Sequence, residues 1–264
     1  MYVLQRLRLT VRYLKTVVPL FVVVCGGGTF FGCSRAIEPL VSAGESAVAL
    51  TGGPNTSMIY VARTSDGVLA VDLGWWGSES ALTRALADLG ASPSEVNAVF
   101  LTHSHRDHIG AWRLVRHARF YVAAPEHSRL VGDTAHRGWI PVLANRIVPG
   151  DLPPPGELNV RTFSWDTSFV LGADTVQAYV VPGHTAGSAV YLFRGILFLG
   201  DAATYSRLSG FAPARPGFSD DAPRAAESLE RLWRRIPAVG VRYICTAHAR
   251  CAHFTRAFLR DVAH

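Results

Sequence analysis

Short apolar runs separated by turn residues make up most of the chain from residue 45 onward. Runs of about four to eight residues that are rich in β-branched and aromatic side chains are typical of strands. Turn sequences such as Gly52-Gly53-Pro54-Asn55 and Ser65-Asp66-Gly67 divide these runs, and the second has hairpin chemistry. We therefore predict strands at residues 46–50, 57–62, 68–73, 96–102, 120–123, 159–165, 169–171, 175–181, 188–193, 196–199 and 241–246.

Other segments space their apolar residues as helices do. Ser78 is suited to begin one of them, and Leu82 and Leu86 then share a face. Residues 124–158 lack such a period and are rich in Pro and Gly, which predicts a long surface excursion. We predict helices at residues 78–89, 109–117, 219–236 and 254–262.

Strands interspersed with helices in two successive halves indicate the fold class α/β. Such elements bury their apolar faces when two mixed β-sheets pack together and helices cover the outer faces. We therefore expect an αββα sandwich. A chain of 264 residues that is 49% hydrophobic and 17% charged has enough apolar material for one packed domain of this kind.

The first 33 residues have a composition of their own. Arg6, Arg8, Arg12 and Lys15 precede the apolar run 17–24 and three consecutive glycines, and this segment has no acidic residue. A basic region followed by a short apolar stretch is typical of a secretory signal. The apolar stretch is shorter than the roughly 20 residues of a membrane-spanning helix. We therefore predict export.

The chain is thus predicted to have three parts: a signal peptide or lipoprotein leader at 1–33, a linker at 34–44 and a folded domain at 45–264. Phe30-Phe31-Gly32-Cys33 resembles a bacterial lipoprotein box. That resemblance implies a lipid on Cys33 and anchoring to the membrane through the N-terminus. Ordinary cleavage nearby and retention of the leader as an anchor are the alternatives. The predicted location is the periplasm or the membrane surface.

Charge and cysteine content narrow the classes of partner and compartment. The leader supplies +4 of the net charge of +6, and the other 22 basic and 20 acidic residues give +2. Because no basic stripe is present, we expect no nucleic-acid binding. Cys245 and Cys251 could pair in an oxidising compartment, although a buried thiol is the commoner state of such residues.

The densest group of metal-binding side chains is His103-Ser104-His105-Arg106-Asp107-His108, directly after the predicted strand 96–102. It places three imidazoles and a carboxylate within six residues. Neutral imidazole and carboxylate suit zinc and similar metals. The alternative is a solvated histidine-rich turn, and chance produces this pattern in about one of a thousand such chains. We interpret the hexapeptide as a metal site.

Three later segments also end a predicted strand in a metal-binding residue: Val181-Pro182-Gly183-His184-Thr185-Ala186-Gly187-Ser188, Phe198-Leu199-Gly200-Asp201 and Ile244-Cys245-Thr246-Ala247-His248. Each is weak evidence alone, because Gly-Asp commonly makes a turn and a lone histidine is commonly structural. Together with the hexapeptide, and in this order, they resemble the metallo-β-lactamase superfamily over essentially residues 45–262. Val71-Asp72-Leu73-Gly74 is similar to that superfamily's early strand end. The resemblance implies the αββα fold, which hosts many reactions.

The resemblance also implies two divalent metal ions, most often Zn²⁺, with Mn²⁺ or Fe as alternatives. The implied ligands are His103, His105 and His184 for the first ion, Asp107, His108 and His248 for the second, and Asp201 as the bridge between them. Two such ions carry +4 and the two carboxylates return −2, which leaves an electropositive pocket. Coordination can lower the pKa of water to about 7 and so produce a nucleophile at neutral pH.

Further residues receive roles on this hypothesis. Asp107 is expected to act as a catalytic residue that carries a proton. Tyr205, four residues beyond Asp201, either hydrogen-bonds the developing oxyanion or packs as an ordinary tyrosine. Asp72 is expected to orient a metal ligand without binding the metal itself. Three tryptophans either line an apolar substrate mouth or lie in the core: Trp75, Trp76 and Trp139.

The predicted function is hydrolysis of a small-molecule ester, lactone, thioester or related bond by a metal-bridging hydroxide. Asp201 favours a glyoxalase II-like or lactonase-like enzyme, because β-lactamases of this superfamily generally lack that bridging carboxylate. The alternatives are a mononuclear iron enzyme resembling persulfide dioxygenases, a β-lactamase proper, and a non-enzymatic metal-binding envelope protein. The sequence specifies neither the substrate nor the oligomeric state.

Overall fold

The computed structural model describes residues 36–37, 46–50, 57–132, 137–147, 152–206, 210–236, 240–249 and 251–254. The predicted leader with Cys33 lies outside the described residues, as do most of the linker and the helix predicted at 254–262 after its first residue. Within the described ranges, no helix combines the length and the apolar character needed to cross a membrane.

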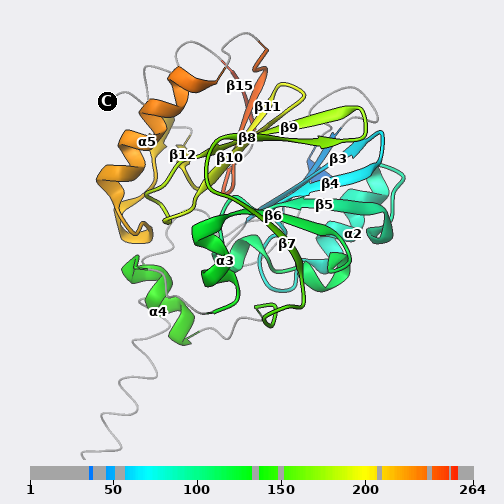
Figure 1. The fold of residues 1–264 in the computed structure, drawn as a ribbon, viewed down its shortest axis with the longest axis horizontal. Coiled ribbons are helices and arrows are strands. Elements are labelled where there is room, and N and C mark those ends of the chain that lie inside the picture. The colour runs from blue at the N-terminus through cyan, green and yellow to red at the C-terminus, as the bar shows by residue number, and fades with distance from the viewer. Residues whose placement is uncertain are drawn as a thin grey trace, which may run out of the picture. The chain divides into compact units, whose positions relative to one another are not determined.

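Two β-sheets form the centre of the domain (Figure 1). The first is antiparallel from β1 to β4 and parallel from β4 to β7. Its strands, in spatial order, are β1 (Ala36–Ile37), β2 (Ser46–Leu50), β3 (Met58–Thr64), β4 (Gly67–Val71), β5 (Val96–Phe100), β6 (Arg119–Ala123) and β7 (Asn159–Phe163).

The second sheet is antiparallel except where β11 pairs with β14. Its spatial order is β15 (Ala252–His253), β14 (Tyr243–Thr246), β11 (Ile196–Gly200), β10 (Ala189–Phe193), β9 (Asp174–Val180) and β8 (Thr167–Leu171). A small separate sheet pairs β12 (Ala203–Ser206) with β13 (Gly210–Pro213).

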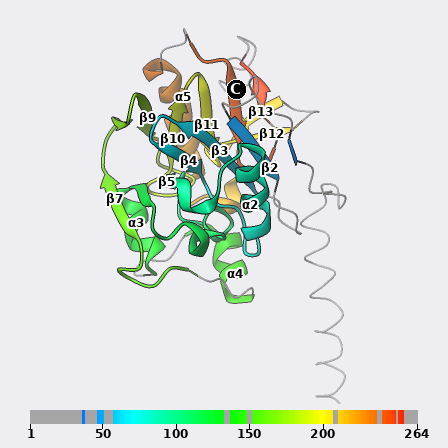
Figure 2. The ribbon, with the colours of Figure 1, turned by 90° about the vertical axis from the view of Figure 1, so that its right-hand side faces the viewer.

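Apolar side chains on both faces of the strands explain the layered arrangement. One cluster, which includes Phe100 and Tyr191, lies between the two sheets. A second joins the outer face of the first sheet to α2 (Glu79–Asp88), and a third joins the second sheet to α5 (Ala222–Arg235). Figure 1 shows α5 and α2 on opposite sides of the sheets, and in the turned view of Figure 2 α2 lies in front and α5 behind. Because both faces of each sheet are covered, burial is maximised, and the predicted αββα sandwich is confirmed.

The helix predicted at residues 109–117 is wrong. The chain makes the 3₁₀ turn η3 (Trp112–Val115) there instead, and another 3₁₀ turn, η2 (Arg106–His108), precedes it. Backbone N–H groups of Gly110 and Ala111 donate to the carbonyl groups of Gly74 and Leu73, respectively, rather than to a preceding helical turn. A Cβ at Gly110 would lie 2.0 Å from the carbonyl oxygen of Trp75. Tertiary backbone contacts therefore outweigh the local helical pattern here.

The prediction of a long surface excursion at residues 124–158 missed two helices in this segment, α3 (Ala124–Leu130) and α4 (Trp139–Ile147). Pro125 lies in the first turn of α3, where its missing N–H costs nothing. The inner face of α3 buries Glu126 and Arg129. Because charged residues occupy the buried face, apolar periodicity could not reveal this helix.

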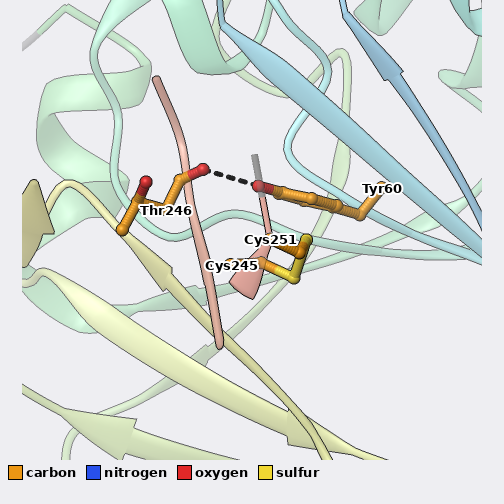
Figure 3. The surroundings of a disulfide bond; sticks show 4 residues. All are labelled: Tyr60, Cys245, Thr246 and Cys251. Atoms are coloured by element: carbon orange, nitrogen blue, oxygen red, sulfur yellow. Dashed lines mark hydrogen bonds between the residues drawn. A yellow bond between two sulfur atoms is a disulfide. The ribbon is translucent and has the colours of Figure 1, made fainter. Parts of the chain in front are cut away.

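Cys245 and Cys251 form a disulfide across the turn that joins β14 to β15 (Figure 3). Cys245 is fully buried between the sheets, and Cys251 packs against the same cluster. Next to the bond, the Tyr60 hydroxyl donates to the carbonyl oxygen of Thr246 at 2.6 Å. The question that the sequence left open therefore has a definite answer in the structure: the two cysteines are paired.

Reduction of this disulfide is expected to lower the free energy of unfolding by about 2 kcal/mol, the size given by loop-closure entropy for a short loop. Urea unfolding of the wild-type protein with and without a dithiol reductant measures the change. Cys251→Ala is the control, since reductant should not alter its stability further. Equal stability of the oxidised and reduced wild type would contradict this expectation.

Candidate metal centre

Five segments that follow strand ends meet at one edge of the sandwich. The hexapeptide 103–108 follows β5 of the first sheet, and His184, Asp201 and His248 follow β9, β11 and β14 of the second. Backbone hydrogen bonds join the edges of the two sheets: Ala189 donates to the carbonyl of Thr102 at 2.8 Å. Asp72 completes the set, directly after β4.

The first group of possible metal ligands comprises His103, His105, His184 and Asp201. Nε2 of His103 lies 2.8 Å from Nδ1 of His105, and Nε2 of His184 lies 3.1 Å from each of these atoms. Ligands of a tetrahedral zinc ion, at about 2.0–2.1 Å from the metal, are about 3.3 Å apart. The three nitrogens therefore converge as the ligands of one ion would. Asp201 Oδ2 is 3.5 Å from His184 Nε2.

The second group comprises Asp107, His108 and His248. Asp107 Oδ2 lies 3.7 Å from His108 Nε2 and 3.4 Å from His248 Nε2. Asp201 Oδ2 lies 3.9 Å from His108 Nε2 and 3.2 Å from His248 Nε2. Asp201 thus faces both groups, which is the position that a bridging ligand requires.

The chemistry of these donors fits a metal ion. His108 Nε2 is fully buried and makes no hydrogen bond to any described residue. An unsatisfied buried nitrogen is costly unless something binds it, and here it points between two carboxylates. Burial lowers the pKa of His184, which favours the neutral form that binds metal. Burial opposes ionisation of Asp201, but the neighbouring histidines, His248 foremost, hold its pKa well below its usual range.

His108 differs from His184 in its charge environment. Burial alone would lower the pKa of His108, but the carboxylates of Asp72, Asp107 and Asp201 outweigh it and raise the pKa to about 9. A metal-free site would therefore hold a proton on His108 at neutral pH. Metal binding requires the deprotonated nitrogen, so it must release that proton.

Asp72 orients the hexapeptide from the buried side. Its Oδ2 accepts hydrogen bonds from His108 Nδ1 and Thr102 Oγ1, both at 2.8 Å, and its Oδ1 accepts from the Thr102 backbone N–H at 2.8 Å. The Asp72 side chain is almost completely buried. Because Nδ1 of His108 donates to this carboxylate, loss of the second ring proton leaves the lone pair on Nε2, the nitrogen that faces the second group.

The structure places the other proposed residues as follows. Tyr205 is half-buried and packs its ring against Phe211 at a centroid distance of 4.7 Å, so its role at an oxyanion stays a prediction.

Trp76 and Trp139 are exposed and Trp75 is half-buried, so none is a fully buried core residue. Among the described residues, His117, His127 and His253 belong to neither ligand group, while His136 and His264 lie outside the described ranges.

Sequence reasoning missed Glu126 and Ser219. Glu126 follows β6, the strand next to β5, and its carboxylate accepts hydrogen bonds from the backbone and hydroxyl of Ser104. Ser219 Oγ lies 3.4 Å from His184 Nδ1, the nitrogen that faces away from the other ligands. The signal available for Glu126 was its position, because an acidic residue directly after a parallel strand lies at the same sheet edge as the hexapeptide.

Comparison with known proteins agrees with this geometry. Residues 52–248 match the sequence profile described as the metallo-beta-lactamase superfamily. A hydroxyacylglutathione hydrolase of Synechococcus sp. (strain JA-2-3B'a(2-13)) is 29% identical over 182 residues, 66% of this chain and 61% of that protein. This chain thus spans less than two thirds of that relative.

A probable polyketide biosynthesis zinc-dependent hydrolase, BaeB, of Bacillus velezensis is 24% identical over 69% of this chain and 68% of that protein. Among solved structures, a metallo-beta-lactamase family protein from Thermus thermophilus superposes with a TM-score of 0.60. It is 19% identical, and the match covers 82% of this chain and 78% of that one, so it supports the fold alone. From its sequence profile, its fold and the order of its strand-end residues, the chain belongs to the metallo-beta-lactamase superfamily.

Proposed function

We propose that this protein is a dinuclear metal-dependent hydrolase that cleaves an ester, thioester, lactone or related bond in a small molecule. One observation carries the proposal: seven side chains of the ligand types that zinc prefers converge in two adjoining groups, and the Asp201 carboxylate faces both. His103, His105 and His184 would hold one ion. Asp107, His108 and His248 would hold the other.

When bound, two such ions would act as Lewis acids and supply a water-derived nucleophile at neutral pH. The chain's own residues set where a substrate can approach. His103, His105 and His184 are buried, whereas the His248 side chain is 39% exposed and that of Asp107 is 18% exposed. A substrate therefore reaches the centre from the side of the second group, where Asp107 can exchange a proton with solvent.

The proposed substrate class follows from the ligand set and the relatives. Asp201 supplies the carboxylate that glyoxalase II-like and lactonase-like enzymes use, and relatives at low identity are named as a hydroxyacylglutathione hydrolase and a zinc-dependent hydrolase. Both names describe hydrolases, and hydroxyacylglutathione is a thioester. Thioesters and lactones are accordingly the first substrates to examine.

Metal content and activity together test the proposal. Protein equilibrated with zinc is expected to hold two ions per chain and to hydrolyse members of a thioester, lactone and ester panel. A chelator should abolish turnover, and added zinc or manganese should restore it. One iron per chain would instead support the mononuclear oxygenase alternative. Turnover confined to β-lactams would support a β-lactamase, and no turnover with metals bound would support a binding protein.

We also propose that the protein is exported and reaches the periplasm or the membrane surface. The Cys245–Cys251 disulfide supports this proposal, because disulfides persist mainly in oxidising compartments. Expression with its own N-terminus, followed by cell fractionation and mass spectrometry of the N-terminal peptide, tests it. Lipid on Cys33 would establish an anchor. An intact leader on cytosolic protein with free thiols would contradict export.

A further inference from the structure

We propose that Glu126 is a positioning residue that holds together the two loops carrying the histidines of the first metal group. The proposal rests on the proposed metal centre. One of the loops is the hexapeptide 103–108, and the other is the segment 181–188 that contains His184. Glu126 belongs to neither loop, because it lies in the first turn of α3.

The contacts of Glu126 join both loops through one carboxylate. Oε2 accepts hydrogen bonds from the Ser104 backbone N–H at 2.8 Å and from the Ser104 hydroxyl at 2.5 Å. Oε1 accepts a hydrogen bond from the Gly187 backbone N–H at 2.8 Å. Three donors from two distant parts of the sequence therefore meet at two oxygen atoms.

Burial makes these contacts strong. The Glu126 side chain is completely buried, where water cannot replace a lost hydrogen bond. Hydrogen bonds to a charged acceptor are also stronger than neutral ones. Arg129 Nη1 lies 4.0 Å from Oε1 and 2.5 Å from Asp220 Oδ2, and the Asp220 backbone N–H donates to the His184 carbonyl at 2.9 Å. The network thus reaches His184 from a second direction.

The backbone of the second loop is shaped to admit this carboxylate. A Cβ added at Gly187 would lie 2.9 Å from Cγ and 3.0 Å from Oε1 of Glu126, and 3.1 Å from its backbone nitrogen. Such distances are tighter than nearly all real Cβ contacts. Gly187 therefore lets the two segments approach, which explains a glycine at this position of the motif.

Ser104 and Gly187, which donate hydrogen bonds to Glu126, lie close in the sequence to the histidines of the first metal group. Ser104 lies between His103 and His105 in the sequence, so fixing its backbone fixes the direction of both imidazoles. Gly187 lies three residues after His184. The three imidazole nitrogens of the group approach to 2.8–3.1 Å, and Glu126 ties together the loops that carry them.

Glu126→Gln tests the inference with almost no change in volume. An amide has one acceptor oxygen and one donor nitrogen, so whichever way it turns, its NH₂ group faces a donor of one loop. We expect one of the two metal affinities to fall about 10- to 100-fold, as is typical when a residue that supports a ligand is changed. Titration of metal-free protein with Co²⁺ against a competing chelator measures both affinities.

Two further variants show which of the two metal affinities Glu126→Gln changes and provide a matched control. His184→Ala defines which of the two affinities belongs to the first group, and Glu126→Gln should weaken that one while the other stays at the wild-type value. Glu157→Gln, an exposed residue paired with Arg116, is the matched control and should change neither. Thermal unfolding of the metal-free variants measures fold stability separately from metal binding.

The outcomes separate this inference from the proposed function. If folded Glu126→Gln binds both ions with wild-type affinity, the positioning role of Glu126 is refuted. If the wild-type protein binds no metal, the proposed metal centre itself is refuted. If Glu126→Gln does not fold, Ser104→Ala carries the test, because it removes only the hydroxyl contact. Ser104→Ala should then measurably weaken binding of the ion of the first metal group, by less than about 100-fold. An unchanged affinity for that ion would overturn the inference.

Discussion

Replacing Asp107 by alanine is expected to lower the turnover number by about 10²- to 10⁴-fold, the range typical of losing a group that transfers a proton. Asp107 Oδ2 lies 3.4 Å from His248 Nε2 and 3.7 Å from His108 Nε2, so the change also removes a ligand and a negative charge from the second group. Bound metal should therefore fall below two ions per chain. Steady-state kinetics and metal analysis of the same preparation measure both effects.

Proton transfer and metal loss can be separated with a second change at the same position. Asp107→Asn keeps the size of the side chain and an oxygen donor, but an amide does not accept a proton. At saturating zinc, Asp107→Asn should bind two ions per chain, unlike Asp107→Ala, but its turnover number should stay low. Asp88→Ala, an exposed residue of α2, is the matched control and should behave as wild type. Full turnover in Asp107→Ala would refute the catalytic role.

Replacing Asp72 by asparagine is expected to weaken binding of the second ion by about 10- to 100-fold, although Asp72 belongs to neither group of possible ligands. The carboxylate accepts from His108 Nδ1 and from two donors of Thr102. An amide nitrogen turned toward His108 forces the imidazole proton onto Nε2, the atom that must bind metal. If the amide turns the other way, its NH₂ group faces the Thr102 backbone N–H, and that hydrogen bond is lost. Metal titration against a chelator measures the loss.

Asparagine is chosen because Asp72 has a φ of +55°, a left-handed conformation that Asn and Asp tolerate better than most residues. An alanine variant would therefore combine backbone strain with the lost carboxylate. Thr102→Val removes a hydroxyl that contacts Asp72 Oδ2 at 2.8 Å and His103 Nδ1 at 3.1 Å, and it keeps the backbone N–H contact to Asp72. It should weaken binding of the second ion less than Asp72→Asn does. Unchanged affinity in a folded Asp72→Asn variant would show that the carboxylate does not control the state of His108.

The predictions that succeeded are those that depend on local pattern. Strands were predictable because a sandwich covered on both sides makes each strand a nearly continuous apolar run, as Ala189–Phe193 shows, where every residue is buried. The helix from Ala222 to Arg235 was predictable from its apolar face, and the Asp221 side chain caps it by accepting from the Arg224 N–H.

The predictions that failed concern segments whose structure depends on contacts between residues far apart in the sequence. At Gly110 the backbone donates to Gly74, a residue 36 positions earlier, and no local period predicts such a bond. In α3 the buried face carries Glu126 and Arg129, whose burial is tolerable only because Ser104, Gly187 and Asp220 supply partners from elsewhere in the chain.

The sequence by itself determined which side chains could bind metal and that each follows a strand, because ligand chemistry and short-range periodicity are properties of neighbouring residues. Only the tertiary structure decided that His103, His105 and His184 approach within 3.1 Å, that Asp201 faces both groups, and that Cys245 pairs with Cys251. Those distances depend on how two sheets pack and where their edges meet. Packing of this kind sums contacts between residues far apart in the chain, so no single segment encodes it.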